Sequence, residues 1–227
     1  IKALQTLEQT HGANSKNLII ALNNLAIVER ELQKYRRAEL LYKRSIHIAE
    51  KEFGVSSKER ADGLDNLGDL YLERQNLPSA KISYEQALVI RKKLFGDESP
   101  EIILSLNKLL EIYREEGNYP LAEKTGKEIV SILEDHPDKD KTNLVTSLTN
   151  LALLYREEGK SAEVEPLLKR TIELAGLPDS GCSKEDLAND MNNLARFYRE
   201  QGNYDQSQIY YKQSLALRQS ILSPHDY

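Results

Sequence analysis

The sequence predicts an all-α protein made of about five stacked repeats, each containing two helices. Two observations support this fold class. Glycine and proline supply only 11 and 7 of the 227 residues, and the abundant Leu, Ala, Glu and Lys favour helices. A set of landmark residues also recurs about every 42 residues, which is typical of a stacked repeat array. Strand signals are weak, because no stretch alternates β-branched and polar residues between turn dipeptides.

The repeat is defined by columns of residues that keep one register along the chain. The main column pairs an asparagine with a leucine at Asn24-Leu25, Asn66-Leu67, Lys108-Leu109, Asn150-Leu151 and Asn193-Leu194. Two further columns follow it, with tyrosine at Tyr71, Tyr113, Tyr155 and Tyr198, and glycine at Gly117, Gly159 and Gly202. Later columns hold alanine at Ala38, Ala80 and Ala122, and a second tyrosine at Tyr42, Tyr84 and Tyr211. Such agreement at one period indicates repeated structural units.

Each unit is predicted to contain two helices joined by a short turn. The glycine column suits the left-handed residue that ends a helix, and Pro78 and Pro120 suit the first turn of the next one. The predicted units span residues 17–58, 59–100, 101–142, 143–184 and 185–227, with residues 1–10 as the tail of a preceding helix. We expect one repeat domain over residues 1–227, with its loosest joint at residues 177–186 around Cys182.

A helical wheel separates two faces of each first helix when the column leucine is numbered position 7. Positions 4, 7, 8 and 11 are predicted to pack inward, and positions 2, 5, 6, 9, 12 and 13 to face the open side. The expected core therefore contains the tyrosines together with Leu25, Leu67, Leu109, Leu151 and Leu194.

The residue pattern resembles the tetratricopeptide repeat. Residues 192–204, which read Asn-Asn-Leu-Ala-Arg-Phe-Tyr-Arg-Glu-Gln-Gly-Asn-Tyr, carry the resemblance best. The long period resembles the kinesin light chain type of this repeat. Lys108 in the asparagine column, Gly126 in an aromatic column and Glu29 in a tyrosine column depart from the pattern. The resemblance implies a right-handed α-α superhelix, a TPR solenoid, whose first helices line the concave surface.

That surface is the expected binding site for an extended peptide or a partner protein. Asparagine has a low helix propensity, so helix stability does not explain why it recurs on an open face. Its amide offers one acceptor and two donors that can hold a peptide backbone, while arginines can hold acidic residues. The expected peptide-binding residues are Asn23, Asn24, Asn66, Asn107, Lys108, Asn150, Asn192, Asn193, Arg114, Arg156, Arg196 and Arg199.

Alternatives to this interpretation stay open. The asparagines can instead bond to a neighbouring repeat and shape the array. The arginines at position 12 and the glutamates at position 13 can pair with each other on a solvated face, and the tyrosines can serve packing alone. In function, the array can be a scaffold, a regulatory or sensor arm of a larger multidomain effector, or a structural or self-assembling spacer.

Other functional classes find little support in the sequence. A net charge of −5 argues against nucleic-acid and membrane-surface partners. No phosphate-binding glycine loop is present, and His11, His47, His136 and His225 are scattered. The single Cys182 fits a reducing compartment and is expected to be an ordinary loop thiol. We therefore expect a cytoplasmic protein with no catalytic residues, metal site or cofactor.

Overall fold

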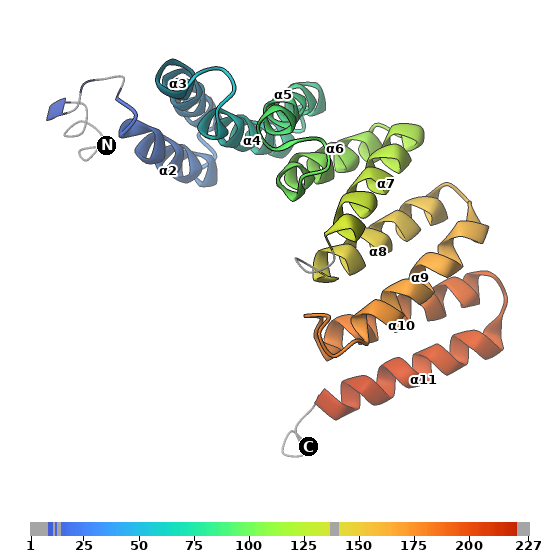
Figure 1. The fold of residues 1–227 in the computed structure, drawn as a ribbon. Helices are drawn as coiled ribbons and strands as arrows, with labels where there is room; N and C mark the ends of the chain where they lie inside the picture. Colours follow the sequence, from blue (N-terminus) through green and yellow to red (C-terminus); the bar gives the residue numbers. More distant parts are fainter. Residues whose placement is uncertain (1–8, 11, 13–14, 137–140, 222–227) are drawn as a thin grey trace. The chain divides into compact units, whose positions relative to one another are not determined.

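The computed structural model describes residues 9–10, 12, 15–136 and 141–221, and this part of the chain contains helices and no strand (Figure 1). The all-α prediction is confirmed. The helices are α2 (Leu18–Glu31), α3 (Tyr35–Phe53), α4 (Lys58–Glu73), α5 (Leu77–Phe95), the short 3-10 helix η1 (Pro100–Ile102), α6 (Ile103–Glu115), α7 (Tyr119–Asp135), α8 (Lys141–Glu157), α9 (Ser161–Ala175), α10 (Lys184–Glu200) and α11 (Tyr204–Ile221). The helix tail expected within residues 1–10 lies mostly outside the described residues.

The helices form two compact units, of which the first ends at Ile112 and the second begins at Tyr113. In the first unit α2 packs against α3, α4 against α5, and α3 against α4. In the second unit α8 packs against α9, α10 against α11, and α7 and α9 contact the first helix that follows each of them. The predicted pairing is confirmed for α2 with α3, α4 with α5, α8 with α9 and α10 with α11, and α4, α8 and α10 begin one or two residues before their predicted units.

The turn inside each repeat has the same backbone geometry in all five. Gly117, Gly159 and Gly202 have φ angles of 69°, 73° and 73°, in the left-handed region. Gln33 and Gln75 hold the equivalent places in the first two repeats with φ of 59° and 56°. The residue after each one donates its N–H to the carbonyl five residues before it, at 2.8 Å in all five turns. This bond is typical of a Schellman ending, which the two glutamines adopt without the conformational freedom of glycine.

Replacing Gln75 by glycine is expected to raise the free energy of unfolding by up to about 1 kcal/mol, because the left-handed conformation costs a residue with a Cβ roughly that much. Urea unfolding followed by circular dichroism measures the change. Gly117→Ala is the matched opposite variant and should lower the unfolding free energy. A destabilised Q75G protein would show that the Gln75 side chain contributes more than its backbone strain costs.

The second helices begin with caps that the repeat motif encodes. The side-chain oxygens of Asn76, Asn118 and Asn203 accept hydrogen bonds from the N–H groups of Ser79, Leu121 and Gln206, at 3.2, 3.4 and 3.3 Å. Pro78 and Pro120 lie within the first two helical positions, as predicted. The glycine and asparagine that follow each other in the motif therefore end one helix and begin the next.

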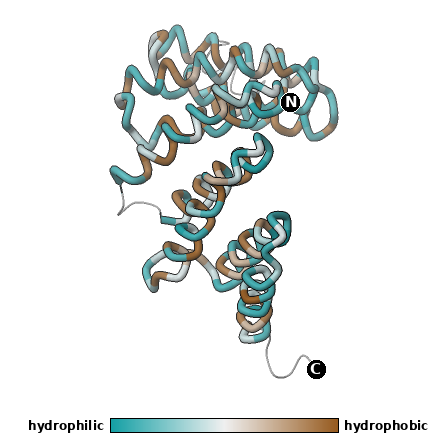
Figure 2. Tube along the Cα trace, turned by 90° about the vertical axis from the view of Figure 1, so that its right-hand side faces the viewer, coloured by the Kyte–Doolittle hydropathy of each residue, from teal (hydrophilic) through white to brown (hydrophobic). Residues whose placement is uncertain are grey.

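The core follows the predicted wheel with three corrections, one of which is that Asp65, at position 5 of the expected open face, is buried. Leu67, Leu109, Leu151 and Leu194 are buried, but Leu25 is only half-buried, so its prediction as a core residue was wrong. Position 10, which the wheel left unassigned, is also buried in the last four repeats, at Leu70, Ile112, Leu154 and Phe197. A first helix in an array packs against its own second helix and against the adjacent repeat, so its apolar surface is wider than one stripe. Figure 2 shows hydrophobic and hydrophilic residues interspersed along the helices.

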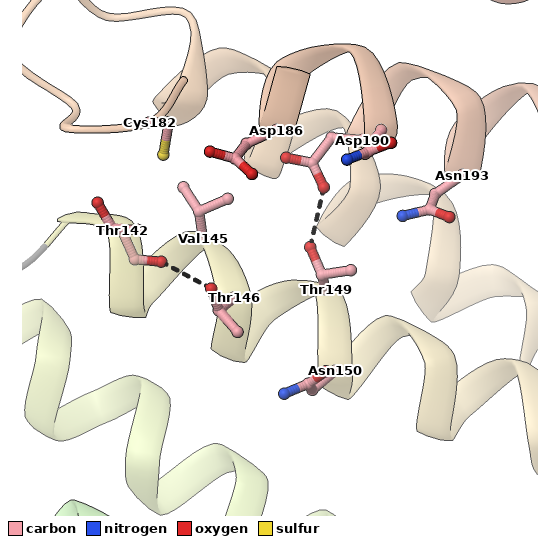
Figure 3. Close-up of a pocket in the computed structure, with 10 residues that line it drawn as sticks. Thr142, Val145, Thr146, Thr149, Asn150, Cys182, Asp186, Asp190 and Asn193 are labelled. Atoms are coloured by element: carbon pink, nitrogen blue, oxygen red, sulfur yellow. Dashed lines mark hydrogen bonds between the residues drawn. The ribbon is translucent and has the colours of Figure 1, made fainter. Parts of the chain in front are cut away.

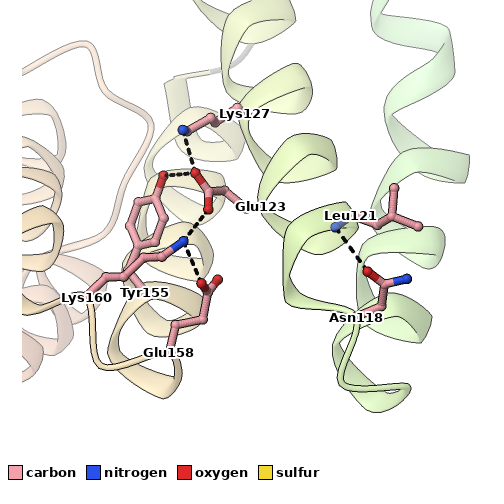
Figure 4. Close-up of polar contacts among 7 residues, drawn as sticks. All are labelled: Asn118, Leu121, Glu123, Lys127, Tyr155, Glu158 and Lys160. Atoms are coloured by element: carbon pink, nitrogen blue, oxygen red, sulfur yellow. Dashed lines mark hydrogen bonds and ion pairs between the residues drawn. The ribbon is translucent and has the colours of Figure 1, made fainter.

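Three tyrosines of the first tyrosine column, Tyr71, Tyr155 and Tyr198, bond through their hydroxyl groups to the preceding repeat. Tyr155 donates a hydrogen bond to Glu123 of α7 at 3.2 Å, and Lys127 and Lys160 lie 2.6 and 2.5 Å from the same carboxylate (Figure 4). These two ammonium groups lower the pKa of Glu123 to about 2. The same tyrosine–glutamate contact recurs between Tyr71 and Glu39 and between Tyr198 and Glu165.

The joint between α9 and α10, which the sequence predicts as the loosest part of the array, contains several hydrogen bonds. Ser180 is buried, and its hydroxyl donates to the Ala175 carbonyl at 3.0 Å. The Thr142 hydroxyl on α8 donates to the Ser180 carbonyl, and Ser183 forms a capping box with Asp186. Leu194 follows Leu151 by 43 residues and not 42, and the turn that contains the extra residue is hydrogen-bonded.

Candidate functional site: a pocket between two first helices

The asparagine column lies on a face of the first helices that internal hydrogen bonds leave unused. Asn24 and Asn150 are exposed, and Asn66 and Asn193 are half-buried. Within residues 15–136 and 141–221, none of these four amides forms a hydrogen bond with the protein. The alternative that they join neighbouring repeats therefore has no support from these contacts, and their donors and acceptors are available to a ligand.

Two of these asparagines meet at one pocket in the second unit. Asn150 on α8 and Asn193 on α10 line a cavity of about 240 Å³ between the two helices (Figure 3). The other lining residues are Thr142, Val145, Thr146, Thr149, Cys182, Asp186, Asn189 and Asp190. Because helical residues three or four apart share one face, α8 and α10 each present several polar side chains to this space.

The charged groups of the pocket are both carboxylates. Asp190 is only 6% exposed, and its Oδ1 accepts a hydrogen bond from the Thr149 hydroxyl at 3.2 Å. Burial raises the pKa of Asp190 to about 6, an effect that Thr149 opposes and the charge of Asp186 increases. Asp186 accepts hydrogen bonds from the N–H and hydroxyl of Ser183 at 2.9 and 2.6 Å, and these bonds lower its pKa.

Two of the four arginines predicted to bind a ligand, Arg114 and Arg156, pair instead with glutamates of the next repeat. Nε of Arg114 lies 3.5 Å from Glu157, and Nε of Arg156 lies 4.0 Å from Glu200. Arg30 and Glu73 make the equivalent pair at 3.2 Å in the first unit. The arginine and glutamate columns therefore pair with each other, which was the alternative interpretation.

The remaining predicted site residues have mixed surroundings. Lys108 forms an ion pair with Asp69 at 2.9 Å. Asn23 is half-buried, and its side-chain oxygen has no hydrogen-bond partner in the described part of the chain. Arg196 is half-buried, whereas Asn107, Asn192 and Arg199 are exposed. The structure brings Asn150 and Asn193 to one pocket, and none of these other residues lines it.

Sequence reasoning missed several residues that line the pocket. Thr146, Thr149 and Asn189 occupy positions 2 and 5, which the wheel assigns to the open face, so their place was available from the sequence. Asp190 occupies position 3, which the wheel left unassigned. Cys182 comes from the joint before α10 and lines the pocket, which its interpretation as an ordinary loop residue did not anticipate.

Across residues 15–136 and 141–221, no group of three or more His, Cys, Asp or Glu side chains could hold a metal ion. None of the helices in that part of the chain is both long enough and apolar enough to span a membrane.

Stacked helix pairs with a polar first-helix face define a helical repeat protein of the kind that binds other proteins. Family models described as tetratricopeptide repeat match residues 1–51 and 59–135, and a further model of that description matches residues 189–226. The chain belongs to the tetratricopeptide repeat family. A search of curated proteins gives no match.

Solved structures share this fold. The chain is similar to a putative kinesin light chain of Podosopora anserina with nearly identical TPR-like repeats (TM-score 0.74, 20% identity, 91% of this chain and 96% of that chain). It is also similar to BtubC (BKLC) from P. vanneervenii (TM-score 0.80, 18% identity, 100% and 90%). YrrB is a further match (TM-score 0.58, 15% identity, 95% and 92%).

Proposed function

We propose that this protein is a scaffold that binds an extended peptide segment of a partner protein along its first helices. The observation that carries the proposal is the pair of amides without internal partners, Asn150 and Asn193, at one pocket between α8 and α10. Such amide groups can donate hydrogen bonds to a peptide backbone and accept hydrogen bonds from it, whatever the side chains of the peptide are. YrrB, a TPR protein described as having an unusual peptide-binding site, has a similar fold.

Amide contacts alone give a weak complex. Each hydrogen bond contributes about 0.5–1.5 kcal/mol net, whereas association costs about 4–15 kcal/mol in lost freedom and ordering. A ligand must therefore add charge or apolar contacts to the backbone bonds. We expect micromolar affinity for a single short peptide, which corresponds to roughly 8 kcal/mol.

Replacing Asn150 and Asn193 together by alanine is expected to weaken peptide binding about tenfold, the loss of one or two hydrogen bonds. The full chain is first panned against a displayed library of random linear peptides. Fluorescence anisotropy then measures the dissociation constant of an enriched peptide for both proteins.

The same variant also tests the alternative that the asparagines hold the array together. Neither amide has an internal partner, and alanine is the better helix former, so the free energy of unfolding should stay constant or rise by up to about 1 kcal/mol. A loss of several kcal/mol would show that the column is structural. A library from which no peptide is enriched would contradict the proposed function itself.

A further inference from the structure

The pocket between α8 and α10 carries negative charge without an internal counter-charge. Asp186 and Asp190 lie four residues apart on α10 and reach the same cavity (Figure 3). Neither carboxylate forms an ion pair within the described residues, and Asp190 Oδ2 accepts no hydrogen bond there. Asp190 keeps one hydrogen bond, from Thr149, so the burial of its charge is only partly compensated within the protein.

The first unit shows how this chain pairs a buried carboxylate with a cation elsewhere. Asp65 on α4 is 7% exposed, and the guanidinium of Arg91 on α5 lies 2.5 Å from it. The same guanidinium also lies 2.7 Å from Asp62 and donates to the Ser105 hydroxyl at 2.7 Å. One internal arginine therefore serves two carboxylates on the first helix.

The last repeat has an arginine at the same place but uses it differently. Arg218 follows Leu194 at the spacing by which Arg91 follows Leu67. Its guanidinium donates to the side-chain oxygen of Asn189 at 2.6 Å, and no contact with Asp186 or Asp190 is formed. The cation that the first unit supplies internally is thus missing from this pocket.

We propose that the pocket binds an arginine or lysine side chain of the peptide, with its cationic group between Asp186 and Asp190 and the adjoining peptide backbone bonded to Asn150 and Asn193. This inference rests on the proposed function. The volume of about 240 Å³ suits one side chain and lies below the usual range for drug-sized ligands. The inference reverses the expectation of an acidic partner at this pocket, because its charged residues are carboxylates and two of the arginines that suggested that partner, Arg114 and Arg156, already pair with glutamates.

Binding of a basic side chain should depend on pH in a defined direction. The groups near Asp190 are Asp186 and Asn189 on α10, the Cys182 thiol, Thr149 on α8 and Arg218 on α11, which bonds to Asn189. Asp190, with its pKa raised to about 6, is ionised above that pH and neutral below it. Affinity is therefore expected to be highest above about pH 6 and to fall as Asp190 is protonated.

The test compares three proteins against one displayed library of random linear peptides. These are the natural chain, D186N/D190N, and the control E173Q/D205N, which removes two charges from exposed residues outside the pocket. The natural chain and the control should enrich peptides that contain arginine or lysine. Fluorescence anisotropy should show that D186N/D190N binds such a peptide about 10- to 100-fold more weakly than the natural chain does. The natural chain should show a similar loss of affinity for the same peptide when the arginine of the peptide is replaced by citrulline.

The outcomes separate this inference from the function on which it rests. Peptides enriched without a basic preference, or bound equally by D186N/D190N, would overturn the cationic pocket and leave the scaffold function intact. An unchanged affinity for the citrulline peptide would overturn it too. Failure to enrich any peptide would contradict both. Circular dichroism of all three proteins checks that the substitutions leave the helices folded.

Discussion

Replacing Arg91 by methionine is expected to lower the free energy of unfolding by about 3–5 kcal/mol. Arg91 is 5% exposed, and its guanidinium contacts Asp62, Asp65 and the Ser105 hydroxyl. Methionine fills similar space, so the loss comes mainly from leaving the Asp65 carboxylate buried and unpaired. Breaking one partner of a buried pair costs far more than the net contribution of the pair, because desolvation of the remaining charge is no longer offset.

The pH dependence of this loss identifies its cause. Burial raises the pKa of Asp65 to about 6, and the guanidinium of Arg91 opposes that rise. Without Arg91 the carboxyl group can become neutral at lower pH, so the destabilisation should shrink as the pH falls from about 8 to about 5. Urea unfolding at both pH values measures it.

Two further variants serve as controls for that experiment. R91M/D65N should regain much of the stability at neutral pH, because it removes the charge that R91M leaves unpaired. R36M replaces an exposed arginine on α3 and should change the unfolding free energy by less than about 0.5 kcal/mol. An R91M protein with a small loss at both pH values would show that water or a neighbouring group solvates Asp65.

The fold was predictable because its determinants are local and repeat. The glycine, asparagine and proline that end one helix and begin the next lie within a few residues of each other, and each recurs at one period. A prediction that fails in one repeat is corrected by the others, as Gln33 and Gln75 show by adopting the glycine conformation. The hydrogen-bonded turn around Ser180 was missed because it occurs once, and its contacts reach back to α8.

The candidate site was only partly predictable, since its charges act between helices. The wheel assigned Asn150 and Asn193 to the open face, but it could not show that their amides lack internal partners. Nor could it show that Arg91 reaches back to α4 while Arg218 bonds to Asn189. Which carboxylates are neutralised depends on side chains far apart in the sequence, and that balance decides the charge of ligand the pocket favours.

The leucine column allows packing to be tested at one position of the repeat in two different environments. Leu109→Ala is expected to lower the free energy of unfolding by about 2–5 kcal/mol, because the residue is 2% exposed and its removal leaves a cavity. Leu25 occupies the same position in the first repeat but is half-buried. L25A should cost about 1 kcal/mol or less, since water already reaches part of this side chain.

Urea unfolding of the two variants followed by circular dichroism measures both losses under the same conditions. Both substitutions change leucine to alanine inside a helix, so helix propensity changes by the same small amount and cancels in the comparison. The difference between the variants therefore reports burial alone. Equal losses would contradict this prediction. They would show that the position in the repeat, and not the local exposure, sets the contribution of each leucine to the free energy of unfolding.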